Sequence, residues 1–333
     1  MSTPNATAKP SIGTREITFG QAINEGLAEE MRRDPTVWAL GEDLGRGGVF
    51  QQYKGLQAEF GPARVCDTPI SEAAIMGAAV GAAMCGTRPV VETRYLDFTL
   101  CAADELVNQA AKARYMFGGQ ARVPIVVRQP TGLWMNCAAQ HSQSLEAWWA
   151  HMPGLVVLAP ATPADSYAMM KAAIRCDDPV ILLEHKELWG VTGEVEEGEA
   201  DARLGKTRIC RAGRDVTIVS WSLTVQACLD AADALAREGI DAEVIDLRCI
   251  WPWDQDAIIA SAAKTKRLLV VHEAVLTAGF GAEIAATVAE ACGARVKRLG
   301  SPRIPVPFSP ALEAAFRRTP EEVAAAVRAL LKA

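Results

Sequence analysis

Apolar residues recur at two different spacings along the chain. Near the start, Ile23, Leu27 and Met31 are four residues apart, so they share one face of a helix that begins near Thr18. The continuous apolar run at residues 37–40 then predicts a short buried strand. The two spacings together predict a chain that alternates helices with buried strands.

The most regular part of this pattern runs from residue 64 to residue 184. The strands are expected at residues 64–66, 89–93, 124–127, 155–159 and 180–184, and the helices at residues 71–86, 99–117, 144–150 and 164–175. Continuous apolar strands separated by helices are typical of a parallel sheet that is covered by helices on both faces.

The pattern changes at residues 190–206, which are acidic, lack apolar periodicity and predict a linker. A second unit of the same kind follows. Its strands are expected at residues 216–220, 242–247, 268–272 and 295–299, and its helices at residues 224–237, 254–264, 281–292 and 321–331. We therefore predict an α/β protein with two parallel-sheet domains, residues 16–189 and 207–333, after a disordered tail at residues 1–15.

Composition excludes several classes of protein. The net charge of −6 gives no electrostatic basis for binding nucleic acid or an anionic membrane. No apolar run approaches the ~20 residues that span a bilayer, and the first residues resemble neither a signal nor a transit peptide, so a cytoplasmic protein is expected. The nine cysteines form no Cys-x-x-Cys pair and the four histidines show no metal spacing, which argues against a zinc or iron–sulfur site.

Folds of this kind bind ligands at the carboxyl ends of their parallel strands, which selects Glu42, residues 68–72 and the segments after Thr93 and Arg128. Within this set, Glu72 lies in the first turn of a helix of small apolar residues, and Ser71 is its expected cap. An acid there can simply complement the helix dipole. A helix buried on most sides would instead favour the protonated form of this carboxyl.

Gly77 and Gly81 lie on one face of the same helix, and they permit either ordinary helix packing or a close approach by another element. Glu72, Gly77 and Gly81 together resemble the pattern of the pyrimidine-binding domain of thiamine-diphosphate enzymes. Longer segments resemble the beta subunit of the first, decarboxylating component of 2-oxo acid dehydrogenase complexes. These segments are residues 67–83, 108–119, 138–144, 244–248 and 252–254, and the similarity runs from about residue 17 to the C-terminus.

The resemblance implies a fold and a set of cofactor contacts. The first domain would be a thiamine-diphosphate pyrimidine-binding fold, and the second would be like the C-terminal domain of transketolase. Glu72 would protonate a ring nitrogen of the cofactor's aminopyrimidine, a role suited to a carboxyl in apolar surroundings. Phe98 would pack on that ring unless it is a core aromatic, and Glu42, Ile70 and Ser71 would line the cofactor.

The resemblance implies two further site residues, Arg94 and His141, whose roles are less well defined. Arg94 falls at a cofactor-lining position where relatives carry an uncharged residue, so its role is open. His141 would meet the substrate or the incoming lipoyl group, although a lone histidine in a polar loop is often inert.

A potassium site is also implied by the resemblance. Ile125, Ala173, Cys176 and Asp178 match a family potassium site that is built mainly from backbone carbonyls. Cys176 departs from the aspartate that relatives place there, so the site would survive only if this residue used its carbonyl.

The chain contains no Gly-Asp-Gly segment, which in thiamine enzymes holds the magnesium and the diphosphate. A partner alpha subunit would supply that half of the site in an α2β2 heterotetramer. The family acts on a small 2-oxo acid and passes the acyl group to a lipoyl-bearing acyltransferase, which the C-terminal domain would help to dock.

The signals for the substrate disagree. Some segments resemble acetoin dehydrogenase beta subunits and others resemble branched-chain enzymes, while pyruvate remains open. Residues 131–137 fit neither type, because relatives have small, glycine-rich residues there. Trp134 and Met135 would either reshape the substrate funnel or change a subunit contact.

Three other functions compete with this interpretation. A ferredoxin-linked oxidoreductase is disfavoured by the absence of cluster spacing among the cysteines. A nucleotide-binding oxidoreductase is disfavoured because the Gly-x-Gly-x-x-Gly fingerprint is missing. A non-catalytic scaffold subunit would have no need of Glu72 or His141.

Overall fold

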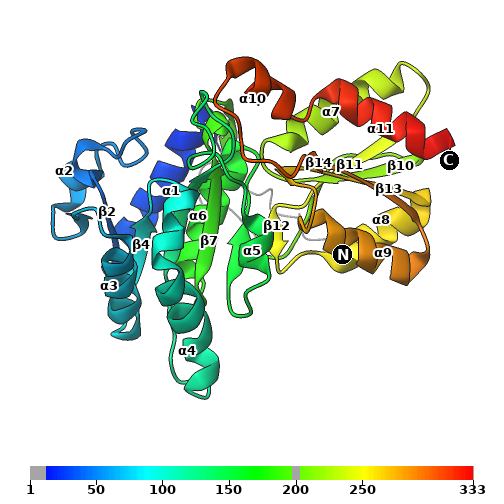
Figure 1. Ribbon diagram of the computed structural model, residues 1–333. Coiled ribbons are helices and arrows are strands. Elements are labelled where there is room, and N and C mark those ends of the chain that lie inside the picture. The colour runs from blue at the N-terminus through cyan, green and yellow to red at the C-terminus, as the bar shows by residue number, and fades with distance from the viewer. Residues whose placement is uncertain (1–12, 197–202, 333) are drawn as a thin grey trace, which may run out of the picture.

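The computed structural model describes residues 13–196 and 203–332. Two mostly parallel sheets, each with one antiparallel edge strand, lie next to each other between layers of helices (Figure 1). The prediction of two α/β domains is therefore confirmed. None of the helices in the described residues is both long enough and apolar enough to cross a bilayer.

The first sheet has seven strands in the order β12-β6-β7-β5-β4-β2-β3. Their bounds are β2 Val37–Gly41, β3 Val65–Asp67, β4 Arg88–Glu92, β5 Val126–Thr131, β6 Val156–Leu158, β7 Val180–His185 and β12 Cys249–Trp251. All neighbouring pairs are parallel except β12 and β6. The edge strand β12 comes from the second half of the chain, so the second unit contributes a strand to the first sheet.

Alternate residues of the central strands pack into two separate cores, as the two-residue period of a strand requires. In β4, Val90 packs against the core that holds α1 (Phe19–Arg33) and α6 (Pro163–Arg175), while Val91 faces the opposite core. That second core is covered by α3 (Glu72–Met84), η2 (Leu96–Ala102), the π-helix η3 (Glu105–Ala110), α4 (Ala111–Met116) and α5 (Glu146–Ala150). The continuous helix expected at residues 99–117 is thus broken into segments of different pitch.

The second sheet has five strands in the order β14-β13-β10-β11-β9. Their bounds are β9 Arg208–Arg211, β10 Val216–Ser220, β11 Ala242–Asp246, β13 Arg267–Val275 and β14 Arg295–Ser301. Figure 1 shows α7 (Thr224–Ala236) and α11 (Pro320–Lys332) on one face, and α8 (Gln255–Thr265) and α9 (Gly281–Cys292) on the other. The proline-rich segment before α11 contains one more helix, α10 (Pro310–Phe316).

The structure contains a strand pair that the sequence does not predict, and it joins the end of the expected tail to the expected linker. Strand β1 (Thr14–Thr18) pairs antiparallel with β8 (Thr192–Glu196), so Thr14 and Arg15 are not part of a disordered tail. The predicted linker likewise begins with a strand. The pairing buries Val195 against Ala22 and Tyr167, and such a short stretch of alternation gives little periodic signal. The rest of the tail, residues 1–12, residues 197–202 of the linker and residue 333 lie outside the described residues.

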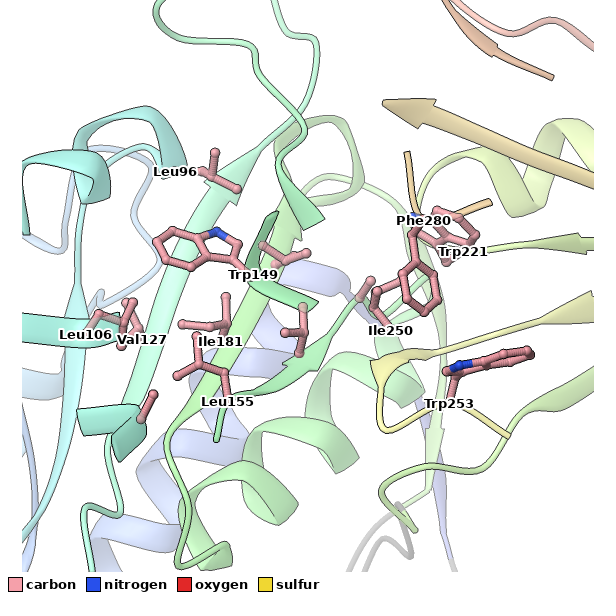
Figure 2. Close-up of a cluster of buried hydrophobic side chains, with 14 of the residues drawn as sticks. Leu96, Leu106, Val127, Trp149, Leu155, Ile181, Trp221, Ile250, Trp253 and Phe280 are labelled. Atoms are coloured by element: carbon pink, nitrogen blue, oxygen red, sulfur yellow. The ribbon is translucent and has the colours of Figure 1, made fainter. Parts of the chain in front are cut away.

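The two domains share one hydrophobic core. Trp149 and Ile181 of the first domain belong to the same buried cluster as Trp253 and Phe280 of the second, with Ile250 between them (Figure 2). Because this cluster continues across the boundary, the position of one domain relative to the other is determined by side-chain packing.

Candidate active site

The predicted site residues lie at one edge of the first sheet. Five neighbouring parallel strands, in the order β7-β5-β4-β2-β3, end at this edge. The segment after each strand carries part of the site: Lys186 and Trp189 follow β7, His141 follows β5, Arg94 and Phe98 follow β4, Glu42 follows β2, and Glu72 follows β3. The order of the strands brings together residues that are far apart in the sequence.

Glu72 is the first residue of α3 and is half-buried. Ser71 occupies the N-cap position but makes no side-chain capping hydrogen bond, so the expectation that it caps the helix is wrong. Ser71 and Ile70 are exposed, with Ile70 at 76% of its full accessible area. An apolar side chain that is open to this degree at a sheet edge is typical of a surface that another molecule covers.

The expectation that α3 is buried on most sides is also wrong for this chain by itself. One face packs into the core through residues such as Ile75 and Met76. The other face is exposed, and it consists of Ala73, Ala74, Gly77, Ala78, Gly81 and Met84. A helix of small apolar residues satisfies its own backbone hydrogen bonds, so it forms without burial, and its outer face remains available to a partner.

The exposed face of α3 continues onto its neighbours. Tyr115, Met116 and Phe117, at the end of α4, are 90%, 72% and 54% exposed. A cavity of about 320 Å³ lies between α3 and the η3–α4 segment, and Gly77 and Gly81 form part of its wall. The two glycines therefore keep open a hollow within an apolar surface.

Glu42, Glu72 and Arg94 form a charged group at the edge of this surface. The Arg94 Nε lies 3.0 Å from Glu42 Oε2, and the same guanidinium also pairs with Asp43. Burial raises the pKa of Glu42, Arg94 opposes this rise, and the nearby charge of Glu72 adds to it. Arg94 adopts a left-handed backbone conformation with φ +59°. The Arg94 guanidinium supplies a positive charge to the Glu42 carboxylate. An uncharged residue at position 94 would leave that carboxylate without this cation.

Phe98 and His141 meet through a third ring. The Phe98 and His141 ring centroids are 5.2 Å apart, and Tyr95 lies 5.3 Å from Phe98 and 5.0 Å from His141, with all three pairs edge to face. Phe98 is half-buried, so it is not a core aromatic. His141 is thus held by packing against aromatic rings.

Lys186 fixes the backbone of His141. Its Nζ donates a hydrogen bond to the His141 carbonyl and lies 4.9 Å from the centre of the Tyr95 ring. Burial lowers the pKa of Lys186 to about 8, although Asp97 acts in the opposite direction. Lys186 is therefore a cation of reduced basicity beside the histidine.

The loop that carries His141 is closed at its base. The Gly132 N–H donates to the Gln143 carbonyl (3.2 Å), and the Gln143 side chain donates to Asp97 (2.8 Å). Gly132 has φ +80°, and a Cβ there would lie 2.2 Å from Nε2 of His185, so only glycine fits. The loop between these residues is therefore held in place at both ends.

Two further residues of the site, Tyr95 and Lys186, are not among those expected from the sequence. Both follow the end of a parallel strand within three residues, so the strand-end rule could have selected them. Their side chains give no motif of their own, since a tyrosine or lysine in a loop is common.

The expected potassium residues lie at the opposite edge of the sheet. Ile125 precedes β5, Ala173 lies in the last turn of α6, and Cys176 and Asp178 precede β7. Arg88 Nη1 donates to the Cys176 carbonyl (3.0 Å) and to the Ile174 carbonyl (2.9 Å), while Nη2 pairs with Asp177.

This arrangement does not fit a potassium ion. The carbonyl that Cys176 would have to offer already accepts from a guanidinium, and a second cation at that oxygen would meet its full positive charge. The Asp178 carboxylate is also paired, with Arg114 at 2.7 Å. Within the described residues, no group of three or more His, Cys, Asp and Glu side chains could hold a metal ion.

Two family models match the chain. The transketolase pyrimidine-binding domain matches residues 15–191, and the transketolase C-terminal domain matches residues 205–323. Among solved structures, the chain is similar to a split-gene transketolase described as an inactive beta4 tetramer, with a TM-score of 0.79, 25% identity and coverage of 95% of this chain and 98% of that one. A transketolase from Pichia stipitis shares the fold, with a TM-score of 0.69 and 17% identity, over 97% of this chain and 48% of that one.

Three curated relatives are similar over nearly their whole length. The chain is 44% identical to the acetoin:2,6-dichlorophenolindophenol oxidoreductase subunit beta of Cupriavidus necator, covering 96% of this chain and 98% of the relative. It is 42% identical to the 2-oxoisovalerate dehydrogenase subunit beta of Bacillus subtilis, covering 94% and 98%. It is 44% identical to the mitochondrial pyruvate dehydrogenase E1 component subunit beta-2 of Oryza sativa subsp. japonica, covering 97% and 89%.

Both transketolase domains occur in the order that the fold shows, and the identity of 42–44% extends over almost the entire chain. The chain therefore belongs to the transketolase-like family of beta subunits of the first component of 2-oxo acid dehydrogenase complexes.

Proposed function

We propose that this chain is the beta subunit of a thiamine-diphosphate-dependent 2-oxo acid dehydrogenase. It acts with an alpha subunit in an α2β2 heterotetramer and carries out the oxidative decarboxylation of a 2-oxo acid. The observation that carries the proposal is the position of Glu72, which is half-buried beside Glu42 at the border of an exposed apolar face.

The cofactor would lie between this edge and the partner subunit. Thiamine diphosphate, when bound, supplies the electron sink for breaking the bond between a carboxylate and the neighbouring carbonyl carbon. The residues at the edge fit its aminopyrimidine: Glu72 can hold a proton for a ring nitrogen, Phe98 offers an aromatic face, and Ile70 and Ser71 are open to contact.

Glu72 depends on the partner for its environment. Coverage of the α3 face by the alpha subunit would remove water from this carboxyl and enclose it beside the cofactor. A group that gives and regains a proton at one fixed position contributes typically 10²–10⁴-fold to the rate. His141, on its closed loop, would meet the substrate or the lipoyl group that removes the acyl product.

The exposed apolar surface supports the need for an alpha subunit. Ile70, Tyr115 and Met116 are each more than 70% exposed, and Met116 lines the hollow whose wall includes Gly77 and Gly81. Apolar patches of this kind mark subunit interfaces. The similar split-gene transketolase chain is described as inactive in its beta4 form, in keeping with a beta subunit that needs a partner.

The remaining parts of the proposal follow the family. The alpha subunit holds the magnesium and the diphosphate, and a lipoyl-bearing acyltransferase receives the acyl group, docked in part by the C-terminal domain. We also propose a cytoplasmic location. The alternative is an acetoin dehydrogenase beta subunit; the identities of 44% to the acetoin, 42% to the branched-chain and 44% to the pyruvate relative do not separate the three substrates.

The test is co-expression with the alpha subunit of the same organism, followed by assay with an artificial electron acceptor. Pyruvate, branched and aromatic 2-oxo acids and acetoin are the substrates. Glu72→Gln should lower kcat by about 10²–10⁴-fold while the heterotetramer survives on size-exclusion chromatography. Glu290→Gln, an exposed position on α9, is the matched control and should leave the rate unchanged.

Two outcomes would contradict the proposal. A Glu72→Gln enzyme with wild-type turnover would remove the assigned role of this residue. A correctly assembled wild-type complex without activity on any of the substrates would favour a scaffold subunit instead.

A further inference from the structure

Five aromatic side chains and one histidine form a continuous row along the candidate site. We call this row the aromatic wall. It consists of Phe50, Tyr95, Phe98, Trp134, His141 and Trp189. The rings come from four separate loops at the edge of the first sheet, the loops that follow β2, β4, β5 and β7.

The row has a definite order in space. It begins at Phe98 and His141, which the proposed function places beside the reacting atoms, and Tyr95 touches both. Phe50 continues the row at 5.8 Å from Tyr95, measured between ring centroids, and it also touches Trp134 at 5.1 Å and Trp189 at 4.3 Å. The wall therefore extends from the reaction centre to a pair of indole rings.

The rings of the wall are only half-buried. All six side chains keep part of their surface open, whereas Trp149 in the core is fully buried. Met135, next to Trp134, is 70% exposed. Rings that served only to fill the core would be enclosed like Trp149, so this row retains aromatic surface for contact with another group.

The segment that presents Trp134 is strained. Met135, Asn136 and Ala138 all adopt left-handed backbone conformations, with φ of +45°, +57° and +62°. Each such non-glycine residue costs about 1–2 kcal/mol relative to an ordinary conformation. Strain of this kind persists where the surroundings over-determine the backbone, and it is concentrated at functional sites.

Several hydrogen bonds hold this strained segment. The Cys137 N–H donates to the Trp134 carbonyl (3.0 Å), and the Leu133 N–H donates to Glu273 Oε1 of the second domain (2.9 Å). The Glu273 carboxylate also lies 3.1 Å from His185. A hydrogen bond between the two domains therefore helps to position the backbone next to Trp134.

A cation, Lys186, stands at the reaction end of the wall. Lys186 lies over Tyr95, and Arg94 adjoins Tyr95 in the sequence. The carboxylate of a 2-oxo acid would be held at this end, which leaves its side chain to run along the rings towards Phe50 and Trp134. A pyruvate methyl group, only about 1.5 Å from its carbonyl carbon, cannot reach that far.

We propose that the wall binds the side chain of the substrate, and that this substrate is a 2-oxo acid ending in an aromatic ring. This inference rests on the proposed function and specifies its substrate class. The rings of Phe50 and Trp134 are edge to face, at 87°, and a further ring can join such an arrangement through its own edge or face. A short aliphatic side chain would leave the open surface of Phe50 and of both tryptophans without a contact from the substrate.

The first test compares substrates in the α–β holoenzyme. The kcat/KM for phenylpyruvate should exceed that for pyruvate and for 4-methyl-2-oxopentanoate by at least about 10-fold, as one well-packed ring provides. Trp134→Ala should lower the value for phenylpyruvate by about 10-fold to 100-fold and leave pyruvate within about 2-fold. Phe308→Ala, an aromatic residue 75% exposed outside the wall, is the control and should change neither value.

The second test measures binding without turnover. 3-Phenylpropanoate, which has no carbonyl to attack, should quench the tryptophan fluorescence of the holoenzyme and compete with phenylpyruvate. In Trp134→Ala both effects should weaken by about 10-fold or more. Saturable quenching that is the same in the variant would place the aryl acid elsewhere and overturn the proposal.

The remaining outcomes separate this inference from the proposed function. A holoenzyme that prefers pyruvate, acetoin or 4-methyl-2-oxopentanoate retains the function and overturns the aromatic substrate. If Trp134→Ala dissociates the subunits and lowers all activities equally, the wall is a subunit contact. If no 2-oxo acid reacts, the proposed function fails, and the quenching by 3-phenylpropanoate still decides whether the wall takes an aromatic acid.

Discussion

The Lys186 side chain interacts with three residues of the candidate site. Its ammonium donates to the carbonyl of His141, lies on the ring of Tyr95, and is attracted by Asp97. A 2-oxo acid bound beside His141, as proposed, would meet this positive charge. Its burial makes the positive charge costly, so the charge is lost at a lower pH than for an exposed lysine.

This lowered pKa predicts a pH dependence of substrate binding. Lys186 is charged below its pKa of about 8 and neutral above it. We therefore expect KM for the anionic 2-oxo acid to rise by about 10-fold as pH increases through 8, since a hydrogen bond to a charged group is lost. The measurement is KM against pH in the holoenzyme, with kcat recorded in parallel.

Lys186→Met is the control for this effect. The variant should show a KM that is already high at pH 7 and does not change between pH 7 and 9. A wild-type KM that is flat over the same range, or a variant that retains the rise, would show that another group causes it.

Strands β5 and β7 lie side by side under the site, and a buried ion pair joins them. Arg128 on β5 makes a two-pronged contact with Glu184 on β7, at 2.6 and 2.8 Å, and both side chains are almost fully buried. Glu92 on β4 is buried nearby, and neither of its carboxylate oxygens finds a hydrogen-bond partner in the described part of the chain. A single guanidinium thus faces two buried carboxyl groups, and burial raises the pKa of Glu92 to about 7.

Loss of this guanidinium should destabilise the first sheet. We expect Arg128→Met to lower the free energy of unfolding by about 3–5 kcal/mol, because Glu184 is then buried without a counter-ion. Denaturant unfolding of the assembled complex measures this change. Arg128→Met combined with Glu184→Leu should recover most of the loss, since an apolar pair of similar volume carries no buried charge. If the double variant is no more stable than the single one, packing rather than charge explains the effect.

The sequence of α3 does not show that one of its two faces is exposed. A run of alanine and glycine is equally compatible with a buried helix and with a subunit surface, because small side chains suit both. The periodicity of Ile75, Met76, Ala79 and Val80 records only the face that meets the sheet. The other face can be assigned only from what lies next to it, which in this chain is solvent.

The two domains of the molecule meet through apolar packing and through one buried carboxyl group, that of Glu146. Glu146 on α5 is buried and accepts a hydrogen bond of 3.1 Å from the indole N–H of Trp221 in the second domain. Burial raises the pKa of Glu146 from 4.5 to about 7. The native state therefore favours the neutral acid between these two pH values, whereas the unfolded chain ionises.

This difference predicts that Glu146 makes the fold less stable as pH rises. Its contribution is most favourable below pH 4.5 and is lost as pH rises to about 7, at a cost of about 3 kcal/mol at most. Glu146→Gln keeps an acceptor for Trp221 and cannot ionise. Compared with the wild type, the variant should gain stability between pH 5 and pH 8, measured by denaturant unfolding at both values. Equal pH slopes in the two proteins would contradict this assignment.

The sequence by itself determined the features that depend on near neighbours. The helix with Ile23, Leu27 and Met31 begins after Thr18 as expected, and Thr18 forms a reciprocal capping box with Gln21. The strands at the centre of both sheets were recognised because residues buried on both faces must all be apolar. Glu72 and His141 were selected by their resemblance to a family, and their roles stay predictions until the complex is assayed.

Only the tertiary structure decided the features that depend on distant parts of the chain. The pairing of β1 with β8, the transfer of β12 to the first sheet and the core shared by Trp149 and Phe280 join segments whose own patterns are weak. The aromatic wall has the same origin: the sequence singles out Trp134 as a departure from relatives, but nothing in its loop shows that it meets Phe50 and that Phe50 meets Tyr95. They meet because the strand order places the ends of β2, β4 and β5 side by side, and no local pattern encodes that order.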